Sequence, residues 1–200
     1  MAERIPATTI SGEDWSLDDL TGRVHEDVLI RDVDASETTS TSGTAFSDCV
    51  FREVRFNLAE YTGAAFTNCT FANCVFFGAT FVDCKFVGSA FERCTFDRMI
   101  VRGGDWSFVK LAGADLRNAS FEDARMREAD LSGTRCSGAK LVKLDLAGAS
   151  FDRGDFEKCD LRGSDVSSMD PWTVKLGRAI IDWQQAVTLA SGMGLDVRAD

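Results

Sequence analysis

The sequence predicts an all-β solenoid, in which short strands stack coil upon coil along one axis, and three observations support this. A large apolar residue recurs at every fifth position from Phe46 to Val166, which gives twenty-five consecutive positions without one charged residue. Small residues recur two positions earlier, and glycine gathers two positions later, where corners need it. A period of five fits neither a helix nor a simple strand. It fits a chain that takes a short extended step, turns a corner and repeats.

Phenylalanine dominates the expected core. The 200-residue chain contains 15 Phe and a single Tyr, and 13 of the Phe fall in the column of large residues. Phe77 and Phe108 lie outside that column and are expected on the surface. Hydrophobic residues make up 44% of the chain, which is too many for a disordered protein. The scarcity of Tyr suits a core in which a phenolic hydroxyl group would find no partner.

Six of the seven cysteines occupy the column of small residues: Cys49, Cys69, Cys74, Cys84, Cys94 and Cys159. The seventh, Cys136, falls in the large column. The number is odd and no CxxC pair occurs, so neither a disulfide framework nor a zinc site is expected. We interpret these residues as reduced thiols that fill a repeated small slot in the core.

The N-terminal part begins with a lead-in over residues 1–9 and then follows the same period one residue out of step. Its large column contains Ile10, Trp15, Leu20, Ile30 and Ala35, and His25 falls in it too. Residues 36–43 offer no large inward residue. A register shift is therefore expected near 36–45, through a bulge or small excursion that inserts one residue. Two interpretations of this segment remain open: simple slack at a corner, or a loop with a role in function.

The periodic stretch, residues 10–170, ends before a different C-terminal segment, residues 171–200. Pro6 and Pro171 bracket the repeat, as expected because proline removes a donor from a strand ladder. Asp182 followed by Gln185 predicts the start of a helix of about ten residues from Trp183. Its apolar face is expected to hold Trp183, Ala186, Val187 and Ala190. The segment can cap the last coil alone, or also pair two subunits.

The repeat unit resembles a known family. Ala114-Asp115-Leu116, Ala129-Asp130-Leu131 and Cys159-Asp160-Leu161 match A(D/N)LXX, the consensus of pentapeptide-repeat proteins. The resemblance implies a right-handed quadrilateral β-helix of about eight coils, with four pentapeptides per coil and a short C-terminal α-helical cap. Inward residues of one face then recur every twenty positions, and one such structural column is Phe46, Phe66, Phe86, Trp106, Met126, Leu146 and Val166.

Enzymatic chemistry finds no support in the sequence. A single His makes a multi-His metal site or a catalytic triad untenable, and Gly103-Gly104 lacks the context of a phosphate loop. A filled β-helix also offers no cleft. We therefore expect that the protein is not an enzyme and that it binds no cofactor and no metal. The chain has no apolar run of eighteen residues and no signal peptide, so we expect no membrane association and a cytoplasmic location.

The net charge of −10 argues against direct binding of nucleic acid, because such binding relies on Lys and Arg. The resemblance is to pentapeptide-repeat proteins of the Qnr and MfpA type, and it implies a different role. Those proteins are DNA mimics that bind DNA gyrase and related enzymes, inhibiting them or protecting them from fluoroquinolones. The expected partners are thus DNA gyrase, with topoisomerase IV as a further candidate, and a second copy of the chain. Drug resistance, self-immunity and housekeeping regulation all remain open.

Candidate residues follow from the same reasoning. The acidic surface for the topoisomerase is expected at Asp105, Asp115, Asp130, Asp145, Asp155, Asp160 and Asp165. Dimerisation is expected through Trp172, Ile180, Trp183, Val187 and Leu195. The charge is uneven, however, with eleven acidic and three basic residues in 1–48 but five of each in 49–100. Arg125 and Arg135 also interrupt two of the acidic stacks. The alternative is a non-enzymatic scaffold that binds a regulatory partner through a flat β face, with Phe77 and Phe108 available for contact.

Overall fold

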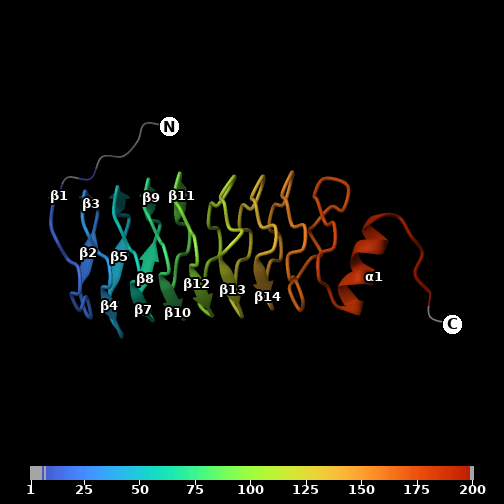
Figure 1. Cartoon of the computed structure of the whole chain (residues 1–200), viewed down its shortest axis with the longest axis horizontal. Coiled ribbons are helices and arrows are strands. Elements are labelled where there is room, and N and C mark those ends of the chain that lie inside the picture. The colour runs from blue at the N-terminus through green and yellow to red at the C-terminus, as the bar shows by residue number, and fades with distance from the viewer. Residues whose placement is uncertain (1–5, 7, 199–200) are drawn as a thin grey trace.

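The computed structural model describes residue 6 and residues 8–198, which form an all-parallel β-solenoid of about seven turns closed by one C-terminal helix (Figure 1). The predicted lead-in, residues 1–9, lies largely outside the described residues, and the first strand already begins at Thr8. The strands have two to four residues each: β1 (Thr8–Ser11), β2 (Val24–Glu26), β3 (Val28–Arg31), β4 (Thr39–Ser40), β5 (Ala45–Ser47), β6 (Val50–Arg52), β7 (Glu60–Thr62), β8 (Ala65–Thr67), β9 (Thr70–Ala72), β10 (Thr80–Val82), β11 (Ala90–Glu92), β12 (Ile100–Arg102), β13 (Ser120–Glu122) and β14 (Lys140–Val142).

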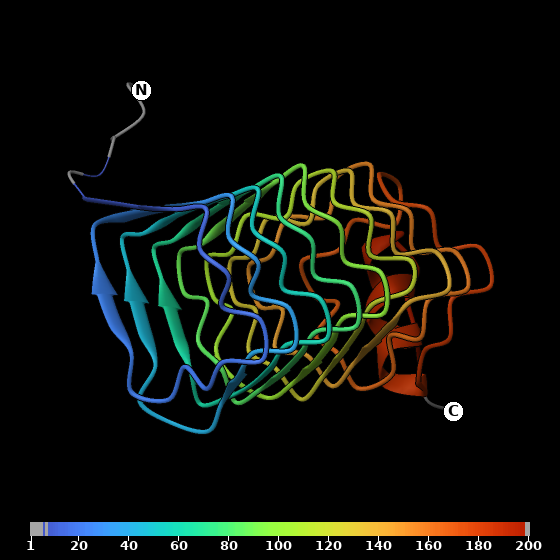
Figure 2. The ribbon, with the colours of Figure 1, turned by 60° about the vertical axis from the view of Figure 1, so that its left-hand side comes forward.

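The coil has four faces (Figure 2). Face 1 holds the sheet β1-β3-β6-β9-β11, face 3 the sheet β14-β13-β12-β10-β7-β4, and face 4 the sheet β2-β5-β8. Face 2 is built from single bridges, such as Asp14 with Asp34 and Arg135 with Asp155, and similar bridges extend the other ladders. Partners are mostly twenty residues apart, as in Phe81 with Val101. Four five-residue steps therefore make one coil, and the fold class is confirmed.

Aromatic rings stack along the shaft at the spacing of the strands. On face 4, Phe46 lies 5.2 Å from Phe66, which lies 4.7 Å from Phe86, and these rings are nearly parallel. Stacking at this distance is favourable and adds to the burial of the rings. All seven residues of the predicted structural column are at most 3% exposed, from Phe46 to Val166.

The predicted register shift near residues 36–45 can be located from the strand pairing. Asp19 pairs with Thr39 at a spacing of 20, but Thr39 pairs with Glu60 and His25 with Phe46 at a spacing of 21. The extra residue therefore lies after Thr39 and before Ala45. The segment does not leave the shaft, because Ser40 occupies the inward position of its coil and is 2% exposed.

Polar side chains fill the core beside this shift. Thr38 and the hydroxyl group of Tyr61 are 2.8 Å apart, and Ser40 lies 2.7 Å from Thr44, whose hydroxyl donates to the carbonyl of Leu20. Buried hydroxyl groups are costly unless paired. The single Tyr thus has a partner after all, contrary to the expectation that the core would offer none.

Helix α1 (Trp183–Gly192) caps the last coil. The side chain of Asp182 accepts from the N–H of Gln185, and that of Gln185 accepts from the N–H of Asp182, so the predicted helix start is confirmed. Gln185 is buried and donates to the carbonyls of Leu161 and Ser164 at 2.6 and 2.7 Å. The helix turns Gln185 and Leu189 toward the coil, and Trp183, Ala186 and Val187 of the expected apolar face lie exposed instead.

Candidate interaction surface

The acidic residues expected to bind a topoisomerase lie on all four faces of the shaft. Asp130 belongs to face 1 and Asp160 to face 3, as their bridges to Ser150 and Ile180 show. Face 2 carries Asp115 and Asp155. Face 4 carries Asp105, Asp145 and, one coil on, Asp165. The structure therefore does not bring these seven carboxylates together on one side, and their role in binding stays a prediction.

Four of these carboxylates are engaged by arginine. Arg125 lies 3.4 Å from Asp105, Arg127 lies 2.7 Å from Asp145, and Arg162 lies 2.7 Å from Asp160. Asp115 pairs with both Arg117 and Arg135. Hydrogen bonds from Arg117 and Arg162 lower the pKa of Asp115 and of Asp160, respectively. Such partly exposed pairs contribute little to stability, but they neutralise the charge that a DNA mimic would present.

Three of the seven, Asp130, Asp155 and Asp165, have no ion pair within the part of the chain that the structure describes. Each accepts a hydrogen bond from the backbone N–H two residues later, at 3.0, 3.1 and 2.9 Å. This bond holds the corner of the coil and leaves the charge uncompensated.

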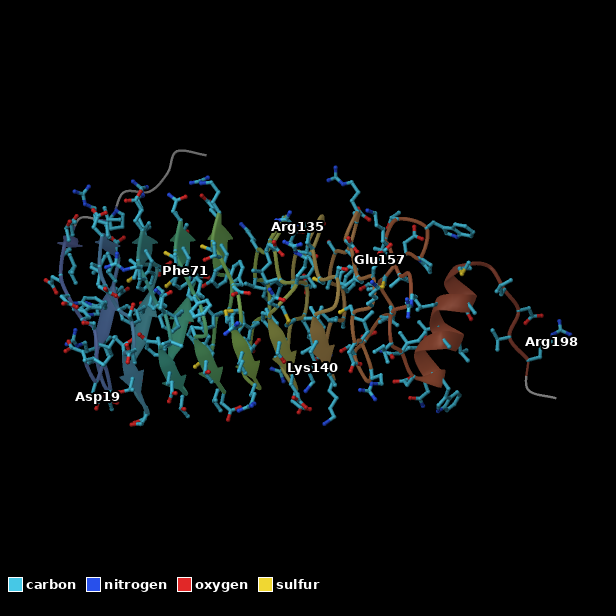
Figure 3. All side chains as sticks on the ribbon, in the orientation of Figure 1. Asp19, Phe71, Arg135, Lys140, Glu157 and Arg198 are labelled. Atoms are coloured by element: carbon cyan, nitrogen blue, oxygen red, sulfur yellow. The ribbon has the colours of Figure 1, made fainter. Side chains whose placement is uncertain are left out.

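A stronger acidic surface lies on the first coil, at the N-terminal end of the shaft. We call it the N-terminal acidic end. It comprises Glu13, Asp14, Asp18, Asp19 and Glu26, distributed over faces 2, 3 and 4 of the first coil (Figure 3 labels Asp19). Only Asp18 has an ion pair among the described residues, to Arg23 at 2.9 Å. Hydrogen bonds from Ser16 and Thr21 lower the pKa of Asp14 and Asp19. Our residue-level prediction missed this surface, although the excess of acidic residues in 1–48 already indicated it.

The C-terminal end is apolar. The residues expected in a dimer interface are exposed, with Trp172 at 71%, Trp183 at 74% and Leu195 at 59%. Together with Met193 and Val197, which the prediction did not include, they form the C-terminal apolar surface: Trp172, Ile180, Trp183, Val187, Met193, Leu195 and Val197. Exposed apolar residues gathered at one end of a molecule are typical of an interaction site, and their role in dimerisation stays a prediction.

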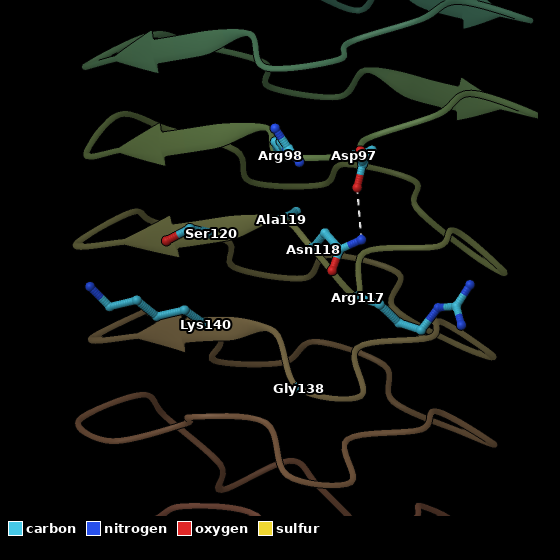
Figure 4. A pocket seen from close by; sticks show the side chains of 8 residues that line it. All are labelled: Asp97, Arg98, Arg117, Asn118, Ala119, Ser120, Gly138 and Lys140. Carbon is cyan, nitrogen blue, oxygen red and sulfur yellow. Dashed lines mark hydrogen bonds between the residues drawn. The ribbon is translucent and has the colours of Figure 1, made fainter.

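On face 2 the ladder between two neighbouring coils is open, contrary to the expectation of no cleft. In the described chain, no backbone hydrogen bond or bridge joins Arg93–Arg98 to Ala112–Arg117 on the coil above, although Phe91 and Ile100 on either side keep theirs. We call this opening the inter-coil crevice. Cavities of about 360 and 530 Å³ lie along it. Figure 4 shows the second of them, where Asn118 donates to Asp97 across the opening.

The crevice lies where the core changes from aromatic to aliphatic. On face 2 the inward residues run Phe56, Phe76, Phe96 and then Leu116. A coil filled by Phe is wider than one filled by Leu. Because protein cores are close-packed, the backbones of the two coils adjust to this difference in width instead of leaving an empty space. The step between the two cross-sections is a physical reason for the ladder to part here.

Nothing in the described residues suggests catalysis. No group of His, Cys, Asp and Glu among them could hold a metal ion. The described helix is not of a length and hydrophobicity that would cross a membrane.

The repeat and the fold define a class of protein. A family model described as a pentapeptide repeat region matches residues 44–121, and one for pentapeptide repeats matches residues 129–167. Together they cover more than half of the chain, which therefore belongs to the pentapeptide-repeat proteins. No curated protein matches the chain significantly.

Solved structures show the same fold. The chain is similar to HetL, described as a pentapeptide repeat protein involved in heterocyst differentiation regulation in the cyanobacterium Nostoc, with a TM-score of 0.54, 18% identity, and coverage of 86% of this chain and 84% of HetL. It is also similar to trypsin-treated QnrB1, described as a plasmid-mediated fluoroquinolone resistance protein, with a TM-score of 0.49, 23% identity, and coverage of 96% and 98%. Identities this low bear on the fold alone.

Proposed function

We propose that the protein is a DNA mimic that binds DNA gyrase or a related type II topoisomerase, and thereby inhibits it or protects it from quinolone-like poisons. The observation that carries the proposal is a net charge of −10 on a straight, filled rod. With about seven turns and strands about 4.8 Å apart, the shaft is about 34 Å long. Such a protein acts in the cytoplasm, where gyrase meets DNA.

Charge density supports this proposal. Two copies joined at the C-terminal apolar surface would form a rod of about 67 Å, and duplex DNA of that length carries about 40 phosphate charges. The dimer would carry −20, twice the −10 of one chain. A basic groove that selects for DNA would therefore attract this rod as well.

The direct test is a supercoiling assay with purified gyrase, run with and without a fluoroquinolone. We expect inhibition of supercoiling, or fewer drug-stabilised breaks, as the concentration of the protein rises. If neither changes up to tens of micromolar of the protein, gyrase is not its partner.

Matched variants locate the contact. One triple variant, Asp14→Asn with Asp19→Asn and Glu26→Gln, neutralises the N-terminal acidic end and keeps acceptors for the corner bonds. The other, Asp130→Asn with Asp155→Asn and Asp165→Asn, removes the same charge near the C-terminus. Loss of the effect on gyrase in the first variant only would place the contact at the tips of the dimer. Loss in the second only would place it near the dimer centre.

A scaffold that binds a regulatory partner is the second candidate. It is favoured by the mixed charge of the middle coils, and by Phe77, which is 38% exposed under the guanidinium group of Arg98 at 5.6 Å. A gyrase assay without any effect, combined with an intact fold and dimer, would favour this function.

A further inference from the structure

The inter-coil crevice changes the environment of one cysteine. All seven cysteines are free, and six are buried, but Cys94 is only partly buried and lines the cavity of about 360 Å³. The other five cysteines of the small column accept, at their carbonyl, the N–H of the residue twenty-one positions later: Cys49, Cys69, Cys74, Cys84 and Cys159. The corresponding bond from Asp115 to Cys94 is missing from the described backbone.

A second cysteine stacks directly on Cys94. Cys74 occupies the same position one coil earlier, and the bridge between Val75 and Thr95 joins the two coils beside them. Bridged parallel strands lie about 4.8 Å apart, so the Cα atoms of the two cysteines have about this separation. Disulfides span Cα distances of about 4.4–6.8 Å, which includes it. The backbone N–H of Thr95 donates to the carbonyl of Cys74 at 3.0 Å, and this hydrogen bond holds the two coils together beside the pair.

The thiol of Cys94 is also the more acidic of the two. The hydrogen bond from the thiol of Cys74 lowers the pKa of Cys94, whereas that of Cys74 is raised. Arg117 and Arg135 line the same cavity. Asp97 and Asp115 line it too, and Asp115 pairs with both arginines, so the hydrogen bond from Cys74 and not the arginines accounts for the lowered pKa of Cys94. The thiolate is the nucleophile in cysteine chemistry.

Cys49 and Cys69 provide an internal comparison. They stack in the same way, and the hydrogen bond from Cys69 lowers the pKa of Cys49 to about 7. Both are only 1% exposed, and their ladder is closed. The two pairs thus differ mainly in access from solvent.

We propose that the stacked pair Cys74 and Cys94 is an oxidation site, which a small peroxide reaches through the inter-coil crevice. The Cys94 thiolate attacks a peroxide oxygen, the O–O bond breaks, and the departing hydroxide takes up a proton to form water. The sulfur of Cys74 then attacks the sulfenic acid of Cys94, the S–S bond forms, and the hydroxyl group leaves with the Cys74 proton as a second water. Two thiols are oxidised, and one hydrogen peroxide is reduced to two waters.

Alkylation of the folded protein tests access. The full chain is treated briefly with iodoacetamide at neutral pH and then digested for mass spectrometry. We expect Cys94 to be modified about tenfold faster than any other cysteine, because thiolate character and exposure together set the rate. Cys94→Ser should remove the fast reaction, and the matched variant Cys49→Ser should leave it. Fast modification at Cys49, or none in the folded state, would overturn the proposal.

Oxidation tests the second step. After hydrogen peroxide, we expect a peptide cross-link between Cys74 and Cys94 that a reducing agent removes. In the variant Cys74→Ser the reaction should stop at a sulfenic acid on Cys94, which dimedone traps. A cross-link between Cys49 and Cys69 instead, or cross-linking only between molecules, would contradict the assignment. Circular dichroism of each variant shows that the fold is retained.

Discussion

At the scale of single residues, His25 replaces an apolar side chain in the large column. Its ring stacks on Phe46 at 5.3 Å and on Trp15 at 6.4 Å, so it continues the aromatic ladder into the first coil. Burial lowers its pKa, and Arg23 lowers it further. The folded state therefore disfavours the imidazolium form.

This gives a pH dependence with a definite sign. The pKa of His25 is lower in the folded state than the usual 6.5. The stability that the neutral ring contributes to the folded state is therefore present above pH 6.5, and it is lost as the pH falls through the lower pKa of the folded state. We expect the melting temperature of the wild type to fall between pH 7 and pH 5 by more than that of His25→Phe. Equal pH dependence in the two proteins would show that His25 is not responsible.

Gly104 occupies a position of the small column with a backbone φ of +84°. A Cβ atom there would collide with the backbone carbonyl of Cys84. We expect Gly104→Ala to lower the free energy of unfolding by more than about 2 kcal/mol, measured by urea denaturation. In the control Gly138→Ala, φ is also positive at +76°, but the Cβ atom meets nothing within 4 Å. That variant should cost about 1 kcal/mol.

At the scale of elements, α1 closes the open end of the last coil through two buried side chains, Gln185 and Leu189, and Gln185 supplies the polar contacts. Gln185→Ala would leave the carbonyl of Ser164 without its partner, while that of Leu161 would keep only the N–H of Ser164 at 3.0 Å. An unsatisfied buried acceptor costs about 1–3 kcal/mol. We expect a loss of about that size in urea denaturation. The neighbouring Gln184 is exposed, so Gln184→Ala serves as the control and should change stability little.

Elements with a strict period were predictable from sequence. The repeat of Phe71, Phe91 and their counterparts defined the coil, and Asp182 with Gln185 marked the start of α1. The orientation of α1 was not predictable, because Trp183 and Val187 look like core residues and only the contact of Gln185 with Leu161 shows which side faces the coil. Segment 36–43 gave a similar difficulty, since its inward residues are polar and become acceptable only through partners outside it, Tyr61 for Thr38 and Thr44 for Ser40.

The candidate surface was less predictable than the fold. The position of each acidic residue on its face follows from the period, so the dispersal of the seven aspartates over four faces was implicit in their numbering. Their pairing with arginines was not, because Arg127 reaches Asp145 across eighteen residues and Arg117 bends back to Asp115. Such contacts depend on side-chain conformation, which the repeat does not determine.

At the scale of the whole molecule, the two ends differ in character. The first coil is acidic and the last is apolar, so the proposed association through the C-terminal apolar surface would keep the charged ends far apart. We expect Trp183→Arg to yield monomers by light scattering, because a charge buried in an apolar interface is costly. Leu17 is 74% exposed at the other end, as Trp183 is at this one, and Leu17→Arg should leave the dimer intact. A monomeric Leu17→Arg variant, or a dimeric Trp183→Arg variant, would place the interface elsewhere.

The missing ladder between Arg93–Arg98 and Ala112–Arg117 bears on how the chain folds. In a solenoid each coil is coupled only to its neighbours, so stability behaves like a one-dimensional array of units and interfaces. A weakened interface divides such an array into cooperative blocks, here a Phe-rich block up to about residue 98 and a Leu-rich block beyond. Native-state hydrogen exchange should reveal two sets of amides that open with different free energies, separated at this level of the shaft.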